Sequence, residues 1–322
     1  MNALRKAAAD YLALRRSLGF ELGRAETRLR QFLAFMEERR KTRITTALAI
    51  EFATRDQRLS PGTIASRLSV VRGFASYLLE RDPMHEIPPA GLLPARKSPA
   101  RPYLYSEDEI AQLLKAARNH PSWNRFPGPW CRRCRSRALY GILGLLAVTG
   151  MRIGEILRLE DGDIDWKEAI LTIRNAKFGK SRLVPLHPSS LEVLAECLRH
   201  RDAFFSRQRP GIKPAAFFVN SCGKRFAVTE INRVFLKLSL EIGLRAPGVR
   251  HGPRLHDFRH RFAVETLLRW YRRGEDVERM LPALSTYLGH THITGTYWYL
   301  SCAPELRAAA GERLEARWKG AR

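Results

Sequence analysis

Two short stretches of the sequence place arginine beside residues that could help it bind a phosphate. Arg152 follows a glycine turn and precedes Glu155 by three residues, and His256 precedes Arg259 by the same spacing. Residues three apart share one face of a helix. A guanidinium can fork onto a phosphate with two hydrogen bonds, and a histidine can donate another. The stretches therefore predict a phosphate site, although a local Arg152–Glu155 ion pair on a helix surface would explain the first one alone.

A third stretch, residues 175–182, is typical of a cationic hairpin tip. Lys177, Lys180 and Arg182 surround Gly179 there. A lysine on a short hairpin can swing into a site and donate a proton to a leaving oxygen. A solvated turn would explain the same composition.

A fourth stretch places two tyrosines after a histidine. His290 follows Gly289, and Tyr297 and Tyr299 come seven and nine residues after His290. Residues two apart on a helix point about 200° apart, so only one of the tyrosines can face a given site. A tyrosine can attack phosphorus if it loses its proton, whose ordinary pKa is about 10. Both rings could equally belong to an aromatic core.

Together the four stretches describe phosphoryl transfer without a metal. Several cationic donors would stabilise the charge that develops on the non-bridging oxygens. The sequence contains no Asp-rich magnesium cluster and no GxxxxGK[ST] loop, so we expect no cofactor and no metal. His256 and His260, four apart, also resemble a zinc hydrolase motif, but Asp257 is shorter than the usual glutamate and Arg259 would repel the ion.

In order and spacing, these stretches resemble the motifs of the tyrosine recombinase (phage integrase) family. The family box T-G-[LM]-R-x-x-E is matched by Thr149 to Glu155, and the hairpin lysine of K-x-x-K-x-R-x-V-P falls on Lys177. The box H-x-x-R-H falls on His256, Arg259 and His260, the box L-G-H falls on His290, and the nucleophile nine residues later falls on Tyr299.

The resemblance implies a site-specific recombinase that cleaves DNA through a 3′-phosphotyrosyl link to Tyr299 and leaves a free 5′-hydroxyl. Arg152, Arg259 and His290 would stabilise the transition state, Lys177 would protonate the leaving oxygen, His256 would assist proton transfer, and Glu155 would orient its neighbours. A homo-tetramer on two synapsed double-stranded DNA sites, alone or with other recombinases, would exchange strands through a Holliday junction. A type IB topoisomerase-like enzyme and a non-catalytic DNA-binding regulator on the same fold are the alternatives.

The elements that must position these residues are mainly helical. Apolar residues at helical spacing mark the first part of the chain, and Ser60-Pro61 is typical of a helix start. A buried helix over 137–149 and two strands over 169–174 and 183–186 follow in the second part. We expect a mainly α fold with a small antiparallel β-sheet. The resemblance divides it into a helical core-binding (SAM-like) DNA-binding domain (1–90), a proline-rich linker (91–102) and an α+β catalytic domain (103–322).

The charge of the chain favours a polyanionic partner. Lys and Arg total 56 against 32 Asp and Glu, a formal net charge of +24, and such a field attracts DNA, RNA or acidic membranes. The residues that we expect to contact DNA are Arg28, Arg67, Arg72, Lys180, Arg182 and Arg254. The longest apolar stretch, 138–148, is shorter than the ~20 residues of a membrane span, and the N-terminus lacks a signal-peptide pattern, so we expect a cytoplasmic protein.

Two features depart from the general family pattern. Residues 119–136 suggest an inserted loop rich in arginine, which would add DNA contacts, and Cys131 and Cys134 have zinc-pair spacing without a second pair. No arm-binding domain precedes the core-binding module, which favours a Xer-like or transposon-type enzyme over a lambda-type one. The last helix, 304–318, resembles the segment that family members dock into a neighbouring protomer, although it could pack on its own domain.

Overall fold

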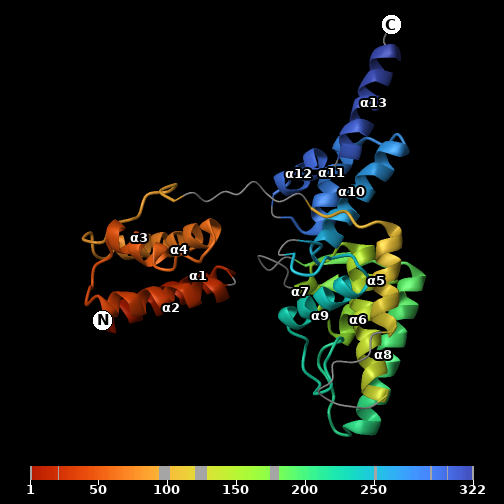
Figure 1. Cartoon of the computed structure of the whole chain (residues 1–322), viewed down its shortest axis with the longest axis horizontal. Helices are drawn as coiled ribbons and strands as arrows, with labels where there is room; N and C mark the ends of the chain where they lie inside the picture. Colours follow the sequence, from red (N-terminus) through yellow and green to blue (C-terminus); the bar gives the residue numbers. More distant parts are fainter. Residues whose placement is uncertain are drawn as a thin grey trace. The chain divides into compact units, whose positions relative to one another are not determined.

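The computed structural model describes residues 2–20, 22–93, 102–119, 129–174, 181–249, 252–290, 292–302 and 304–320. The chain divides into two compact units, Met1–Ala100 and Arg101–Arg322 (Figure 1). Each unit has its own hydrophobic core. The tip of the hairpin, with Lys177 and Lys180, lies outside the described residues, as does most of the proline-rich segment.

The described residues of the first unit form four helices: α1 (Asn2–Ser17), α2 (Gly23–Glu38), α3 (Thr46–Thr54) and α4 (Pro61–Leu79). Helix α4 starts as predicted, because the Ser60 side chain accepts a hydrogen bond from the Thr63 N–H and Pro61 occupies the first turn. The predicted apolar stripes form the core of the unit, with Phe32, Met36 and Phe74 fully buried.

The second unit combines a small sheet with nine helices in the described part of the chain. The helices are α5 (Glu107–Asn119), α6 (Pro129–Thr149), α7 (Ile153–Ile156), α8 (Pro188–Gln208), α9 (Val228–Glu241), α10 (Asp257–Arg272), α11 (Val277–Leu288), α12 (Thr294–Cys302) and α13 (Pro304–Gly320), and a 3-10 turn, η1 (Asp161–Asp163), precedes the sheet. Helix α6 is central, since α5, α8 and α10 all pack against it (Figure 1). No described helix is both long enough and apolar enough to cross a bilayer.

The sheet is antiparallel in the order β1-β2-β3, formed by β1 (Ile164–Asp165), β2 (Ile170–Ile173) and β3 (Arg182–Pro185). Leu171 pairs with Val184 and Ile173 pairs with Arg182. The predicted pairing of two strands is therefore confirmed. Strand β1 was not predicted, because two residues are too few to show an alternating pattern.

The start of α6 differs from the sequence prediction. The loop expected over 119–136 ends early, because α6 begins at Pro129 and not near residue 137. Proline is well suited to the first turn of a helix, where its missing N–H leaves no bond unmade. Near this end of the helix, the Arg135 guanidinium donates to the Ser221 hydroxyl (3.0 Å), and Cys134 packs against the Phe204–Phe205 cluster. Arg125 lies outside the described residues, and the side chains of Cys131 and Arg132 are not described.

Candidate active site

The site begins at a glycine turn that ends the central helix α6. Gly150 has a φ of +60°, and a Cβ at this position would lie 2.8 Å from the Phe262 ring. The Thr149 hydroxyl donates to the Leu145 carbonyl and accepts from the Met151 N–H at 3.3 Å. This turn leaves Arg152 as the residue that precedes α7.

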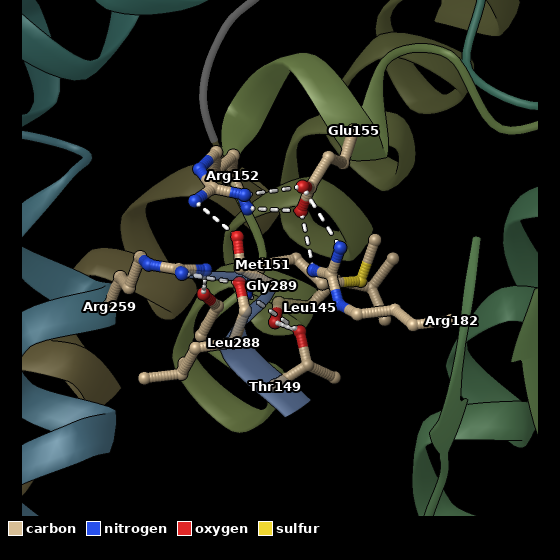
Figure 2. Close-up of polar contacts among 10 residues, drawn as sticks. Leu145, Thr149, Met151, Arg152, Glu155, Arg182, Arg259, Leu288 and Gly289 are labelled. Carbon is tan, nitrogen blue, oxygen red and sulfur yellow. Dashed lines mark hydrogen bonds and ion pairs between the residues drawn. The ribbon is translucent and has the colours of Figure 1, made fainter. Parts of the chain in front are cut away.

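Glu155 lies between two arginines (Figure 2). Its carboxylate accepts the backbone N–H of Arg152 (2.9 Å) and the Arg152 Nη1 (2.9 Å), and it accepts both Nη1 (3.1 Å) and Nη2 (2.7 Å) of Arg182. Burial opposes the charge of Glu155, but the hydrogen bonds and charges of Arg182 and Arg152 outweigh burial and lower its pKa to about 2. The two arginines therefore favour the ionised form of Glu155.

Arg259 is anchored by backbone carbonyls. It is 1% exposed, its Nη1 donates to the Gly150 carbonyl at 3.0 Å, and its Nη2 donates to the Leu288 carbonyl. The Arg152 Nη2 donates to the adjacent Gly289 carbonyl at 3.0 Å (Figure 2). Burial and the like charge of Arg152 lower the pKa of Arg259 to about 10, so the Arg259 guanidinium stays cationic near neutral pH. Two turns, one after α6 and one after α11, thus gather both arginines at one place.

Three histidines lie in the same region. The His290 Nδ1 lies 2.8 Å from the Thr296 hydroxyl, and burial with the nearby charges of Arg259 and Arg152 lowers the pKa of His290 to about 4. His256 precedes α10, and partial burial and the Arg259 charge lower its pKa. The His256 ring lies 4.8 Å from that of His260. Near pH 7 these cationic surroundings favour neutral imidazoles, which can accept a proton.

The two tyrosines point in different directions, as their spacing predicts. Tyr297 is 46% exposed, whereas Tyr299 is 2% exposed. The Tyr299 ring lies 6.1 Å from His290 and 5.5 Å from His260, measured between ring centroids. The charge of an ionised Tyr299 would raise the pKa of Arg259.

The structure brings together six of the seven predicted catalytic residues, namely Arg152, Glu155, His256, Arg259, His290 and Tyr299. The seventh, Lys177, lies outside the described residues. Across the described ranges, no three His, Cys, Asp or Glu side chains are grouped as metal ligands would be.

The residues expected to contact DNA have varied surroundings. The Arg182 side chain is 9% exposed and is bound by Glu155. It does not face outward, as a DNA contact would. Arg72 donates to the carbonyls of Pro88 (2.7 Å) and Pro89 (2.8 Å). Arg28 donates to the Ser66 hydroxyl, Arg67 lies over the Phe52 ring, and Arg254, with a side chain that is 53% exposed, donates to Asp257. Lys180 lies outside the described residues.

Sequence reasoning gave no role to His260 or to the carbonyls of Gly150, Leu288 and Gly289. The His260 Nδ1 is buried and has no hydrogen-bond partner in the described structure. Burial and the charges of His256, Arg254 and Arg259 lower its pKa to about 3. The H-x-x-R-H box already contained this histidine. The carbonyls leave no mark in a sequence apart from the glycines that shape their turns.

The sequence pattern described as the phage integrase family matches residues 104–305. A putative integrase/recombinase of Sinorhizobium fredii is 46% identical over 325 residues, which cover 99% of this chain and 99% of that protein. The tyrosine recombinase XerC of Chlamydia caviae is 29% identical over 252 residues, which cover 78% of this chain and 70% of that protein.

Solved structures show a similar fold. The Tn1549 transposon integrase, in complex with transposon right end DNA, gives a TM-score of 0.63 at 17% identity and covers 96% of this chain and 99% of that chain. The XerH site-specific recombinase, bound to a palindromic difH substrate, gives a TM-score of 0.59 at 19% identity. The match covers 85% of this chain and 74% of that chain. The predicted mainly α fold with a small antiparallel sheet is thereby confirmed.

Proposed function

The chain belongs to the phage integrase family of tyrosine-type site-specific DNA recombinases, and from that premise we propose that Tyr299 is the residue through which it joins to DNA. The resemblance predicted from the sequence is therefore confirmed, and the protein is a DNA strand transferase. One observation carries the assignment of the nucleophile: the buried Tyr299 ring is stacked with the His290 ring, with 6.1 Å between the ring centroids.

The proposed cleavage step is a transesterification at phosphorus. The Tyr299 hydroxyl oxygen attacks the scissile phosphate, the bond from phosphorus to the 5′-oxygen breaks, and a 3′-phosphotyrosyl ester forms. The energy of the broken diester is kept in the new ester, so a 5′-hydroxyl can reverse the step without ATP. Arg152 and Arg259, each already anchored on a carbonyl, direct their remaining N–H groups at the non-bridging oxygens.

Histidines supply further hydrogen bonds and a place for the proton of Tyr299. When the Thr296 hydroxyl donates to the Nδ1 of His290, the Nε2–H of His290 is left to donate to a phosphate oxygen. Neutral His256 is able to assist proton transfer. Lys177 would protonate the leaving 5′-oxygen, an assignment that rests on the family resemblance.

Double-stranded DNA is the proposed partner. The net charge of +24 supports it, as do the XerH recombinase and the Tn1549 integrase, two proteins of similar fold that were solved with DNA bound. We assign the helical residues 1–90 to core-site binding, residues 91–102 to the linker and residues 103–322 to catalysis. Arg28, Arg67 and Arg254 stay candidates for phosphate contacts.

We further propose a homo-tetramer on two synapsed sites, acting alone or with other recombinases. Helix α13 supports this assembly. Leu306 is packed within its own unit, whereas Leu314 and Trp318 are 61% and 75% exposed. The outer end of α13 extends away from the other helices of the unit (Figure 1). These apolar side chains suit contact with a neighbouring protomer.

The test is covalent capture without a metal. The protein is incubated in EDTA with a pool of nicked duplexes that carry a randomised core, and DNA that stays bound in hot detergent is recovered and sequenced. The wild type and the Tyr297→Phe variant should both enrich one sequence family as an adduct, and Tyr299→Phe should not. An adduct formed by Tyr299→Phe would contradict the assignment, and no adduct with the wild type would contradict the mechanism.

A further inference from the structure

Arg182 is placed inside the site and not on the outer face of its hairpin. It is the first residue of β3, and its side chain is 9% exposed. Both of its terminal nitrogens bond to Glu155, at 3.1 and 2.7 Å (Figure 2). Two parallel hydrogen bonds of this kind fix the orientation of both groups. The guanidinium is thus directed toward an acid of the site and away from the solvent through which DNA would approach.

Gly289 allows this arrangement. A Cβ added there would lie 3.1 Å from the Arg182 Nη1 and 3.6 Å from the Arg152 Nη1. This turn therefore lies close to both arginines that share Glu155, and a side chain at position 289 would crowd them. Its carbonyl bonds one of them, Arg152.

The charges of the three side chains suggest what Arg182 does. Glu155 is ionised and Arg152 is cationic, so this pair alone has no net charge. Arg182 adds one positive charge, which leaves the group of three at +1. At low effective dielectric such a balance matters, because a neutralised guanidinium attracts a phosphate less strongly than a free one.

We propose that Arg182 is a positioning residue for strand cleavage: it holds and neutralises Glu155, so that Glu155 orients Arg152 without cancelling its charge toward the scissile phosphate. The inference rests on the proposed function, because it concerns the same Arg152. Arg182 also fixes the start of β3 to the arginine site. It acts through Glu155 and does not itself touch the substrate.

The experiment measures the single-turnover rate of adduct formation and, separately, DNA affinity. Arg182→Met keeps the length of the side chain and removes its charge and donors. We expect the rate to fall about 100-fold, while the DNA dissociation constant stays within about twofold. The double variant Arg182→Met with Glu155→Gln removes both charges, restores +1, and should recover at least about tenfold of the lost rate.

Arg174→Met is the matched control. Arg174 follows β2 on the same hairpin, its side chain is 62% exposed, and it pairs with Asp163 at 2.7 Å. Its loss should leave the rate of adduct formation unchanged.

Three results would overturn the proposal. A loss of DNA affinity that accounts for the loss of rate would make Arg182 a DNA contact. If the double variant does not regain the rate of adduct formation, neutralisation of Glu155 is excluded as the role of Arg182. If Arg182→Met does not fold, Arg182→Lys decides, since it keeps the charge: a folded Lys variant within tenfold of the wild-type rate supports the proposal, and a rate lower than that contradicts it. In each case the wild type still forms its adduct, which separates these failures from failure of the proposed function.

Discussion

Arg259 shows how a buried cation can be kept for catalysis. Two carbonyls accept hydrogen bonds from its guanidinium and fix the plane of the group. Burial and the charge of Arg152 lower its pKa only to about 10. A lysine would keep the charge but could not bond both carbonyls and a phosphate in one fixed plane. The role of Arg259 therefore depends on its shape as well as on its charge.

We expect Arg259→Lys to lower the rate of adduct formation by about 100-fold or more, because a missing donor at a developing oxyanion typically has this effect. DNA affinity should change little. Arg261→Lys is the control, since Arg261 lies on the same helix and donates to the Tyr105 carbonyl at 2.8 Å. Rapid-quench measurement of the adduct tests both variants, and equal losses in the two would contradict the prediction.

The histidines make stability depend on pH. The pKa of His260 is lowered to about 3 and that of His290 to about 4, both from an ordinary value near 6.5. Between those values the unfolded chain binds protons that the folded chain does not, so stability rises with pH. The contribution is fully present above about pH 6.5 and is lost as the pH falls toward 3.

The unfolding temperature should therefore fall steadily as the pH is lowered from 7 to 4. His260→Asn removes one of these groups, and its unfolding temperature should depend less on pH over this interval. Calorimetry at matched ionic strength measures both. A pH dependence that is unchanged in His260→Asn would contradict the lowered pKa.

At the scale of elements, the turn after α6 does most to place the site. Gly150 combines a φ of +60° with close contact to Phe262, and its carbonyl holds Arg259. No side chain fits there without strain. The turn after α11 is similar, since Gly289 has a φ of +66°.

We expect Gly150→Ala to lower the free energy of unfolding by about 2 kcal/mol or more, from the left-handed backbone and the overlap with Phe262. Gly144→Ala is the matched control within α6, because nothing lies within 4 Å of its added Cβ. In a helix interior that change should stabilise the protein by roughly 0.5–1 kcal/mol. Urea unfolding measures both, and a Gly150→Ala variant as stable as the wild type would show that the turn tolerates a side chain.

Sequence reasoning predicted the elements that carry strong local signals. The cap at Ser60 and the pairing of β2 with β3 both follow from short-range chemistry. The start of α6 was missed because proline breaks a helix in its interior but is favourable in its first turn. Strand β1 was missed because two residues are too few to show an alternating pattern. The motif spacing named the charged residues that the structure brings together. It could not show that Arg182 turns inward, since only the tertiary fold brings it to Glu155.

At the scale of the whole molecule, the charge of +24 predicts DNA binding that weakens steeply with salt. Each phosphate contact adds about 0.9 to the slope of log affinity against log salt. The slope thus measures how many cations contact DNA phosphates. Its change on substitution distinguishes the arginines of the first unit that contact DNA from those that do not.

We expect Arg28→Ala and Arg67→Ala each to reduce the salt slope by about 1. Arg72→Ala should leave the slope unchanged, because its guanidinium is held by the carbonyls of Pro88 and Pro89. Fluorescence anisotropy over a salt series, with the captured DNA sequence, measures all three. A slope reduced by the loss of Arg72 would show that this arginine reaches DNA.

The burial of Tyr299 has a consequence for the cell that carries the protein. A hydroxyl on a side chain that is 2% exposed cannot meet a passing diester or a small electrophile in solution. With Tyr299 as the proposed nucleophile, we therefore expect free copies of the protein not to nick chromosomal DNA. On the proposed mechanism, α12 has to rearrange when DNA is engaged, so that cleavage begins only on bound DNA.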